Sequence, residues 1–197
     1  MYQINFYQTD RPYGCFSNFS NHPIKVENKI WPTSEHYFQG MKFKNTEHEE
    51  LIRLASTPME AATMGRDRSR PLRSDWEQIK DEVMRIAVKA KISQNISVRN
   101  ILLSTGNCII VEHTKNDSYW ADGGDGTGKN MLGLILMEVR NSLEEYEEEF
   151  YLPQWMAFPG IHPFDMFWRK GKGEEYVSVK YIPPSPHVCI DEIMSSI

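Results

Sequence analysis

Residues 31–42, with the sequence WPTSEHYFQGMK, are the stretch that decides how the N-terminal half of the chain folds. The threonine and serine at its third and fourth positions can each cap the start of a helix, which then runs to about Phe43. On that helix Glu35 and Lys42 project from one face about 10 Å apart along the axis, with Gln39 between them. This stripe can line a pocket for a sugar or a base, although an exposed face held by salt bridges has the same spacing.

The elements around this stretch follow from capping signals and apolar spacing. Capping boxes, and apolar residues at three- and four-residue steps, indicate that the middle of the chain is helical. The expected elements are strands at 4–7, 24–26 and 29–31, helices starting at about 33, 46, 57, 74 and 97, a buried strand at 108–111 and an apolar helix over 131–146.

The composition is that of an ordinary soluble globular protein. The chain has 197 residues, a net charge of −5, 40% apolar residues and 25% charged residues, enough to bury a core in one compact domain. The negative charge removes a long-range attraction to nucleic acid, while a local basic patch stays possible. The longest apolar stretch, 131–137, is far shorter than the roughly 20 residues of a membrane helix. With no signal peptide visible and three widely separated cysteines, we expect a cytoplasmic protein that binds no membrane.

A glycine-rich segment, YWADGGDGTGKN at residues 119–130, directly precedes the apolar helix. Four glycines in six residues permit positive backbone φ angles, and the start of a helix offers free N–H groups to an anion. The segment satisfies G-x-x-x-x-G-K, but Asn130 stands where a nucleoside-triphosphatase needs Ser or Thr for magnesium, which excludes that class. Two interpretations stay open, an anion or sugar site and a purely structural loop.

Residues 66–73 hold four arginines within an otherwise acidic chain. Guanidinium groups bind phosphate through two parallel hydrogen bonds, so this cluster can hold a phosphate, and surface salt bridges explain it equally well. The histidines and cysteines show no metal-ligand spacing, and no G-x-S-x-G is present. We therefore expect no metal site and no serine hydrolase.

Several of these strings occur in one order that resembles the NADAR family, also called YbiA-like proteins. The resemblance covers residues 4–146 and rests on residues 16–19, 31–39, 42–43, 64–66, 94–95, 102–106, 119–123 and 126–133. Two departures are mild, because Gly40 and Ala121 stand where the family more often has alanine and glycine, respectively. The resemblance implies a helix-rich α+β fold of a single domain with a few short strands, and an N-glycosidase that needs no cofactor.

The substrates that the resemblance implies share a ribose attached to a nitrogen and at least one phosphate. Some family members are associated with cleaving the base–ribose bond of phosphorylated riboflavin-pathway intermediates, ribosylaminopyrimidine phosphates. Others remove ADP-ribose from guanine in nucleic acid. A non-catalytic module that binds ADP-ribose or NAD is the alternative to an enzyme, and the sequence does not determine the oligomeric state.

Residue roles follow from the chemistry of breaking a C1′–N bond, which builds positive charge on the ribose. We assign Glu35 and Asp122 to stabilising that charge and to moving protons, and expect the fold to bring these carboxylates together. Lys42 is expected to form a transient Schiff base, as the resemblance suggests for the ADP-ribosyl-guanine members. The expected substrate-binding residues are Asn18, Phe19, Trp31, Gln39, Arg66, Trp120, Asp125, Gly126, Lys129 and Asn130.

The segment after residue 149 has a different texture. Prolines are interleaved with tryptophan and phenylalanine, which is too aromatic for a free tail. We expect an N-glycosidase domain over residues 1–149, and an aromatic- and Pro-rich extension over 150–197 that packs on the domain or on a partner. A further interpretation makes the extension an interaction surface, with the domain as its scaffold.

Overall fold

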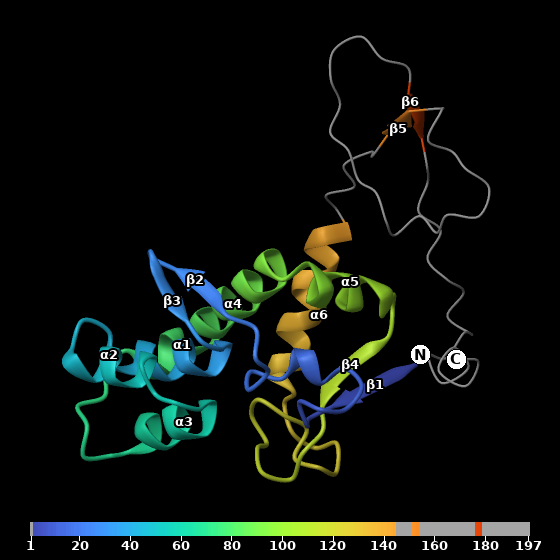
Figure 1. Ribbon diagram of the computed structural model, residues 1–197. Coiled ribbons are helices and arrows are strands. Elements are labelled where there is room, and N and C mark those ends of the chain that lie inside the picture. The colour runs from blue at the N-terminus through green and yellow to red at the C-terminus, as the bar shows by residue number, and fades with distance from the viewer. Residues whose placement is uncertain (1, 145–150, 154–175, 179–197) are drawn as a thin grey trace. The chain divides into compact units, whose positions relative to one another are not determined.

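The computed structural model describes residues 2–144, 151–153 and 176–178 (Figure 1). The chain divides into two compact units, Met1–Ser142 and Leu143–Ile197. In the second unit the described residues form one antiparallel pair, β5 (Tyr151–Pro153) with β6 (Tyr176–Ser178). The predicted packing of residues 150–197 lies outside the described residues.

The first unit is helix-rich, with short strands at both ends of its helical middle. The predicted helices near residues 33, 46, 57, 74 and 97 are confirmed as α1 to α5, and the helix expected at 131 is confirmed as α6. Its elements are β1 (Gln3–Phe6), η1 (Gly14–Phe16), β2 (Ile24–Val26), β3 (Lys29–Trp31), α1 (Ser34–Gly40), η2 (Met41–Phe43), α2 (Glu47–Arg53), α3 (Pro58–Arg66), α4 (Trp76–Gln94), α5 (Ile96–Ser104), β4 (Ile109–Glu112) and α6 (Met131–Glu144).

Two small sheets frame these helices. β2 and β3 pair antiparallel around Glu27 and Asn28, whose φ angles of 49° and 63° suit the tight turn of a two-residue hairpin. β1 and β4 pair in parallel with Phe6 opposite Glu112, and Figure 1 shows the two strands side by side. β4 then leads through the glycine-rich segment into α6. At Gly133, any Cβ would lie 2.1 Å from the carbonyl oxygen of Ile110, so the glycine lets α6 approach the strand closely.

Helix α1 is the centre of the unit, because every one of its residues is buried. It packs against α2, α3 and α4, and the hydroxyl of Thr33 accepts a hydrogen bond from the backbone N–H of His36 at its start. The alternative interpretation, in which this helix presents an exposed face held by salt bridges, is therefore wrong. The ring of His36 bonds to the Thr33 hydroxyl at 2.8 Å and to the Ala55 carbonyl at 3.2 Å, so it is part of the core.

The predicted continuation of this helix to Phe43 is wrong in its last turn. The α-helix ends at Gly40 and residues 41–43 form a tighter 3₁₀ turn. A Cβ at Gly40 would lie 2.6 Å from the Trp31 indole, so the glycine allows the end of the helix to pack directly on that ring. The change of helix type alters where the side chain of Lys42 points relative to the stripe above it.

A buried lysine on α4 supports the loop that carries Asn18 and Phe19. Lys91 is 2% exposed, and its ammonium group donates to the carbonyl oxygen of Ser17 at 2.7 Å and to the hydroxyl of Ser20 at 2.5 Å. Burial lowers the pKa of Lys91 to about 7, against a smaller opposing effect of Cys15. The folded protein therefore releases this proton at a lower pH than the unfolded chain does.

We expect Lys91→Met to remove a pH-dependent part of the stability. Between about pH 7 and pH 10 the unfolded chain holds a proton that the folded protein has lost, so wild-type stability should rise by up to about 1.4 kcal/mol per pH unit relative to the variant. Urea unfolding at steps of pH measures this difference. Lys89→Met, at an exposed position of the same helix, should follow the wild-type slope. Identical slopes in wild type and Lys91→Met would contradict the prediction.

Candidate active site

The glycine-rich segment meets α1 through an aromatic cluster. The ring of Phe38 packs edge-to-face on Trp120 at 5.2 Å and on Trp76 of α4 at 5.1 Å between centroids. Asp117 accepts hydrogen bonds from the backbone N–H groups of Tyr119 and Trp120, both at 2.7 Å, which holds Trp120 in this position. The loop therefore touches α1 one turn beyond Glu35.

Glu35 is a buried carboxylate in this region. Its side chain accepts a hydrogen bond of 2.7 Å from the Gln39 amide, and its backbone N–H donates to the carbonyl of Asn18 at 3.1 Å. Burial raises the pKa of Glu35, and the hydrogen bond from Gln39 and the positive charges of Arg66 and Lys42 oppose that increase. The helix thus holds a carboxyl group whose pKa is raised by burial although two cations from other elements act against that increase.

Lys42 projects from the 3₁₀ turn after α1. Its amine donates to the carbonyl of Gly65 at 3.0 Å and lies 5.7 Å from the ring centroids of both Phe38 and Trp76. Burial lowers the pKa of Lys42, and the charge of Arg66 lowers it further, while Glu35 opposes both. A lysine in such surroundings holds a larger fraction of neutral, nucleophilic amine at neutral pH than an exposed one does.

Asp122 makes its hydrogen bonds within its own loop. Its carboxylate bonds to the His113 ring at 2.7 Å and accepts from the backbone N–H groups of Gly124 at 2.8 Å and Thr114 at 3.2 Å. Burial alone would raise the pKa of Asp122, but these bonds outweigh it and the pKa is lowered. The loop charge that acts on Glu35 comes from Asp117 instead. These contacts favour Asp122 as a residue that holds the loop in shape.

Asn130 closes the same loop at its other end. Its φ angle is +51°, its side-chain oxygen accepts from the N–H of Glu112 at 3.0 Å, and its amide nitrogen donates to the carbonyl of Ile110 at 2.8 Å. The N–H of Asp122 donates to the carbonyl of Glu112 at 3.0 Å. Both ends of residues 122–130 are therefore bonded to β4, and the amide of Asn130 is used for this purpose.

Glu112 is a residue that the sequence did not single out. It ends β4, is half-buried, and its carboxyl group makes no hydrogen bond or ion pair with any other residue that the structure describes. Burial, followed by the negative charges of Asp117, Glu35 and Asp122, raises its pKa to about 7. A carboxylate at the end of an apolar strand was the one signal that could have drawn attention to it.

Trp76, the first residue of α4, is a second residue that the sequence analysis did not single out as functional. It is 5% exposed. Its ring nevertheless forms one wall around the Lys42 amine, with Phe38 as the other. The helical periodicity reports burial and does not reveal which buried ring lies beside a functional group.

Three further residues that were expected to bind the substrate are Asn18, Phe19 and Trp31. Asn18 is 8% exposed, its amide nitrogen donates to the sulfur of Met84 at 3.2 Å, and its buried side-chain oxygen has no hydrogen-bond partner among the described residues. Phe19 is half-buried beside it. Trp31 is 1% exposed and packs on Tyr37 at 5.3 Å, so the structure places it in the core.

The tip of the glycine-rich loop is exposed. Asp125 accepts two hydrogen bonds from Thr127, and Gly126 has a φ angle of +82° with open space where a side chain would be. The amine of Lys129 lies 4.9 Å from the ring centroid of Tyr119, whose hydroxyl donates to Asp81 of α4 at 2.8 Å. The tip thus presents a cation and an uncovered glycine backbone at the edge of the aromatic cluster.

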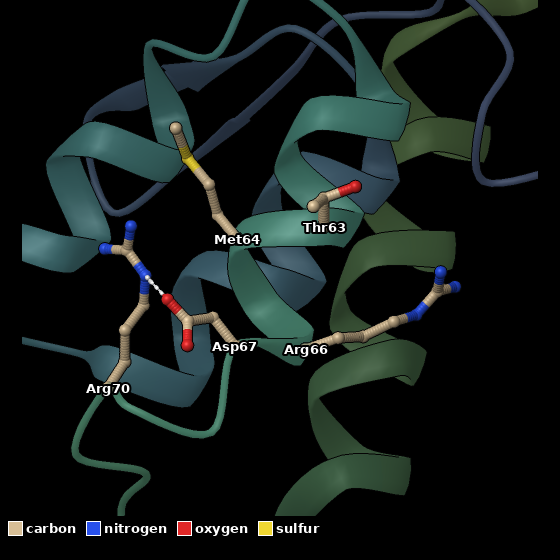
Figure 2. A pocket seen from close by; sticks show the side chains of 5 residues that line it. All are labelled: Thr63, Met64, Arg66, Asp67 and Arg70. Carbon is tan, nitrogen blue, oxygen red and sulfur yellow. Dashed lines mark ion pairs between the residues drawn. The ribbon is translucent and has the colours of Figure 1, made fainter.

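Two arginines of the cluster at residues 66–73, Arg66 and Arg70, point their side chains in different directions (Figure 2). Arg70 pairs with Asp67 at 3.4 Å and also bonds to His48. Arg70 and Asp67 line an open hollow of about 570 Å³ together with Thr63, Met64 and Arg66. Arg66, at the end of α3, extends away from that pair and forms no ion pair with the described residues. Because its charge acts on both Glu35 and Lys42, it is the arginine associated with the candidate site.

Comparisons with known proteins identify the family to which the chain is similar. The family model of the NADAR domain matches residues 5–144. The N-glycosidase YbiA of Escherichia coli K12 is 57% identical over 140 residues, covering 71% of this chain and 88% of the relative. An N-glycosidase of Nostoc punctiforme is 43% identical, covering 71% and 92%. The NMR structure of E. coli YbiA superposes with a TM-score of 0.69 at 56% identity, covering 73% of this chain and 86% of that one.

These matches define an enzyme class and then a family. The protein is a hydrolase that acts on N-glycosyl compounds, and the chain belongs to the NADAR family. The similarity to the NMR structure of E. coli YbiA confirms the predicted α+β fold. A riboflavin biosynthesis protein of Vibrio vulnificus is 36% identical and covers 90% of this chain but 50% of its own length, so its match extends beyond residue 149. No described helix is long and apolar enough to cross a membrane.

Proposed function

We propose that this N-glycosidase hydrolyses the base–ribose bond of a ribosyl phosphate, and that its substrate is a ribosylaminopyrimidine phosphate of the riboflavin pathway. Relatives named riboflavin biosynthesis proteins, in Vibrio vulnificus and in maize, support this substrate. The observation that carries the proposal is the conjunction of buried Glu35 with Lys42 and Arg66 beside Phe38 and Trp120. A cytoplasmic location agrees with such a substrate.

In this reaction the ribose is the part of the substrate that lies beside the carboxylate of the site. As the C1′–N bond breaks, its electron pair leaves with the base and positive charge develops on the sugar ring. Burial raises the pKa of Glu35, and Gln39, Arg66 and Lys42 oppose that increase. In its ionised form Glu35 stabilises the charge or takes a proton from the attacking water. The attack of water on C1′ completes the hydrolysis.

The other residues of the proposal bind the two ends of the substrate. Arg66 holds the phosphate, with Lys129 and the backbone near Gly126 at the loop tip. Trp120 and Phe19 stack on the base, and the unpartnered oxygen of Asn18 bonds to its edge or to the ribose. Gln39 orients Glu35, while Asp122, Asp125 and Asn130 keep the loop in shape.

ADP-ribosylated guanine is a second candidate substrate, which the position of Lys42 favours. An amine whose pKa is lowered by burial can attack C1′ and form a Schiff base with the opened sugar. Both substrates present the same phosphorylated ribose to Arg66, Glu35 and Lys42, and they differ in the leaving base.

The experiment incubates the purified full-length protein separately with the early riboflavin intermediates and with an oligonucleotide that carries ADP-ribosylated guanine. Chromatography should detect free base from the first substrate, and the matching unphosphorylated riboside should react more slowly because Arg66 lacks its ligand. Binding of ADP-ribose or NAD without release of any base would instead identify a non-catalytic module. Release from the guanine substrate alone would select the second candidate.

A further inference from the structure

Gly65, the last residue but one of α3, contacts two side chains of the proposed site. Its carbonyl oxygen accepts a hydrogen bond of 3.0 Å from the Lys42 amine. Its Cα lies against the Gln39 amide, because a Cβ built at this position would be 2.0 Å from the amide oxygen and 2.7 Å from the amide carbon. Gln39 belongs to α1 and Lys42 to the 3₁₀ turn that follows it, so one residue of α3 touches two consecutive elements.

The reason for a glycine at this position is space and not backbone conformation. Gly65 is buried within an α-helix, and it is not among the described residues with a positive φ angle, so its backbone would accept an L side chain. Alanine favours a helix more strongly than glycine does. A side chain is excluded here because the Gln39 amide occupies the space that it would need.

The position of the Gln39 amide decides how Glu35 is held. The amide nitrogen donates to the Glu35 carboxylate at 2.7 Å, while the amide oxygen lies against Gly65 and has no hydrogen-bond partner among the described residues. Gln39 is 4% exposed, so its amide is enclosed by other residues. The amide is therefore confined between the carboxylate of Glu35 and the backbone of Gly65.

The amine of Lys42 is held by the same residue. It lies 5.7 Å from the ring centroids of both Phe38 and Trp76, which limit the space around it without giving it a direction. The hydrogen bond to the Gly65 carbonyl supplies that direction, since it is the one hydrogen bond that the described residues give this amine.

We propose that Gly65 is a positioning residue of the N-glycosidase reaction proposed above, and this inference rests on that reaction. Its bare Cα fixes the Gln39 amide against Glu35, and its carbonyl oxygen fixes the Lys42 amine, so the carboxylate and the amine keep one separation. Groups that act on the same C1′ must hold their working geometry closely, because a displacement of about 1 Å can cost about 10²-fold in rate.

The test is a double-mutant cycle between positions 65 and 39 of the full-length protein. Gly65→Ala should displace the Gln39 amide and lower kcat for release of base from the ribosylaminopyrimidine phosphate by about tenfold or more. Gln39→Ala should cause a loss of similar size, because it removes the same hydrogen bond to Glu35. In the Gln39→Ala background, Gly65→Ala should lower kcat by less than about threefold more, since the two closest contacts of the new methyl group are gone.

A second measurement on the same variants reports the surroundings of Glu35 without any substrate. Burial raises the pKa of Glu35, and the hydrogen bond from Gln39 opposes that increase. Loss of this bond in either single variant should therefore raise the pKa of Glu35 further, and the double variant should show no additional change. A ¹³C NMR titration of the glutamate carboxyl carbons measures the pKa, with Glu35→Gln to assign the signal.

Gly14→Ala is the control for a loss of packing alone. A Cβ at Gly14 would lie 2.4 Å from the carbonyl oxygen of Gln8, so this variant should lower the midpoint of thermal unfolding while kcat and the pKa of Glu35 match wild type. Additive losses of kcat in the cycle, or a Gly65→Ala protein with wild-type kcat and an unchanged pKa of Glu35, would overturn the positioning role.

Two further outcomes separate folding and reaction from positioning. If Gly65→Ala alone does not fold, recovery of folding in the double variant would support the contact between Gly65 and Gln39, and no recovery would count against it. A wild-type protein that releases no base, in a set of variants that still shows the coupled change in the pKa of Glu35, would overturn the proposed reaction and leave the hold of Gly65 on the Glu35–Gln39 pair supported.

Discussion

Glu35→Gln should lower kcat for base release by about 10²- to 10⁴-fold while the midpoint of thermal unfolding stays equal or rises. The substitution removes a charge that the developing positive charge on ribose requires. It also removes a buried carboxylate whose pKa is raised by burial, and such a group is less stabilising in its ionised form as the pH rises above its ordinary range. The glutamine can still accept the hydrogen bond from Gln39.

A buried glutamate outside the site provides the matched control. Glu49 on α2 is 4% exposed, pairs with Lys29 at 2.5 Å and accepts from the N–H of Asn45 at 2.6 Å. Glu49→Gln should therefore lose stability and keep the wild-type kcat, the reverse of Glu35→Gln. Steady-state kinetics and calorimetry on both variants measure the difference. If Glu35→Gln kept near-normal turnover, the assignment of Glu35 to the chemistry would be wrong.

With ADP-ribosylated guanine as the substrate, Lys42→Ala should abolish a covalent adduct that borohydride traps in the wild-type protein, and should lower kcat by about 10²-fold. The neutral amine of Lys42 bonds to C1′ as the base leaves with the electron pair of the C1′–N bond, and the amine loses a proton. The C1′–O4′ bond then breaks with its electron pair on O4′, which takes a proton, so that an imine joins Lys42 to the opened sugar. Hydride from borohydride reduces this imine to a stable secondary amine, whereas water would return ADP-ribose and free lysine. Burial and the charge of Arg66 lower the pKa of Lys42 and so favour the attacking form.

Peptide mass mapping locates the adduct, because trypsin does not cleave after an alkylated lysine. Lys89→Ala, at an exposed position of α4, should keep both the adduct on Lys42 and the full rate. Full activity of Lys42→Ala together with no adduct in wild type would remove the Schiff base from the mechanism and leave direct attack by water.

The local elements were predictable because their signals are local. Thr33 begins α1, and Glu27 with Asn28 turns the β2–β3 hairpin, where sequence and structure agree. The end of α1 was not predictable, since it depends on how Gly40 packs on the Trp31 ring. The parallel pairing of β1 with β4 joins segments about a hundred residues apart, and no pattern within either strand specifies its partner.

Some residues of the candidate site were likewise predictable from the sequence, and others were not. The stripe of Glu35, Gln39 and Lys42 was visible from helical spacing, although its burial was not. Glu112 and Asp117 escaped notice because a glutamate at a strand end, or an aspartate in a polar loop, has no distinctive neighbours in sequence. Their importance arises from the charges that the fold brings near them, Glu35 above all.

The bonds that tie both ends of residues 122–130 to β4 have an evolutionary consequence. Because Asp122 and Asn130 anchor the backbone frame, the exposed tip at residues 125–127 can change composition without disturbing the strand or α6, whereas a Cβ at Gly124 or Gly128 would lie 2.9 Å or 2.5 Å from neighbouring backbone atoms. Variation within the family in how the phosphate end of the substrate is bound is therefore expected to concentrate at that tip, while the residues proposed to contact the ribose and the base lie outside it and are inherited unchanged.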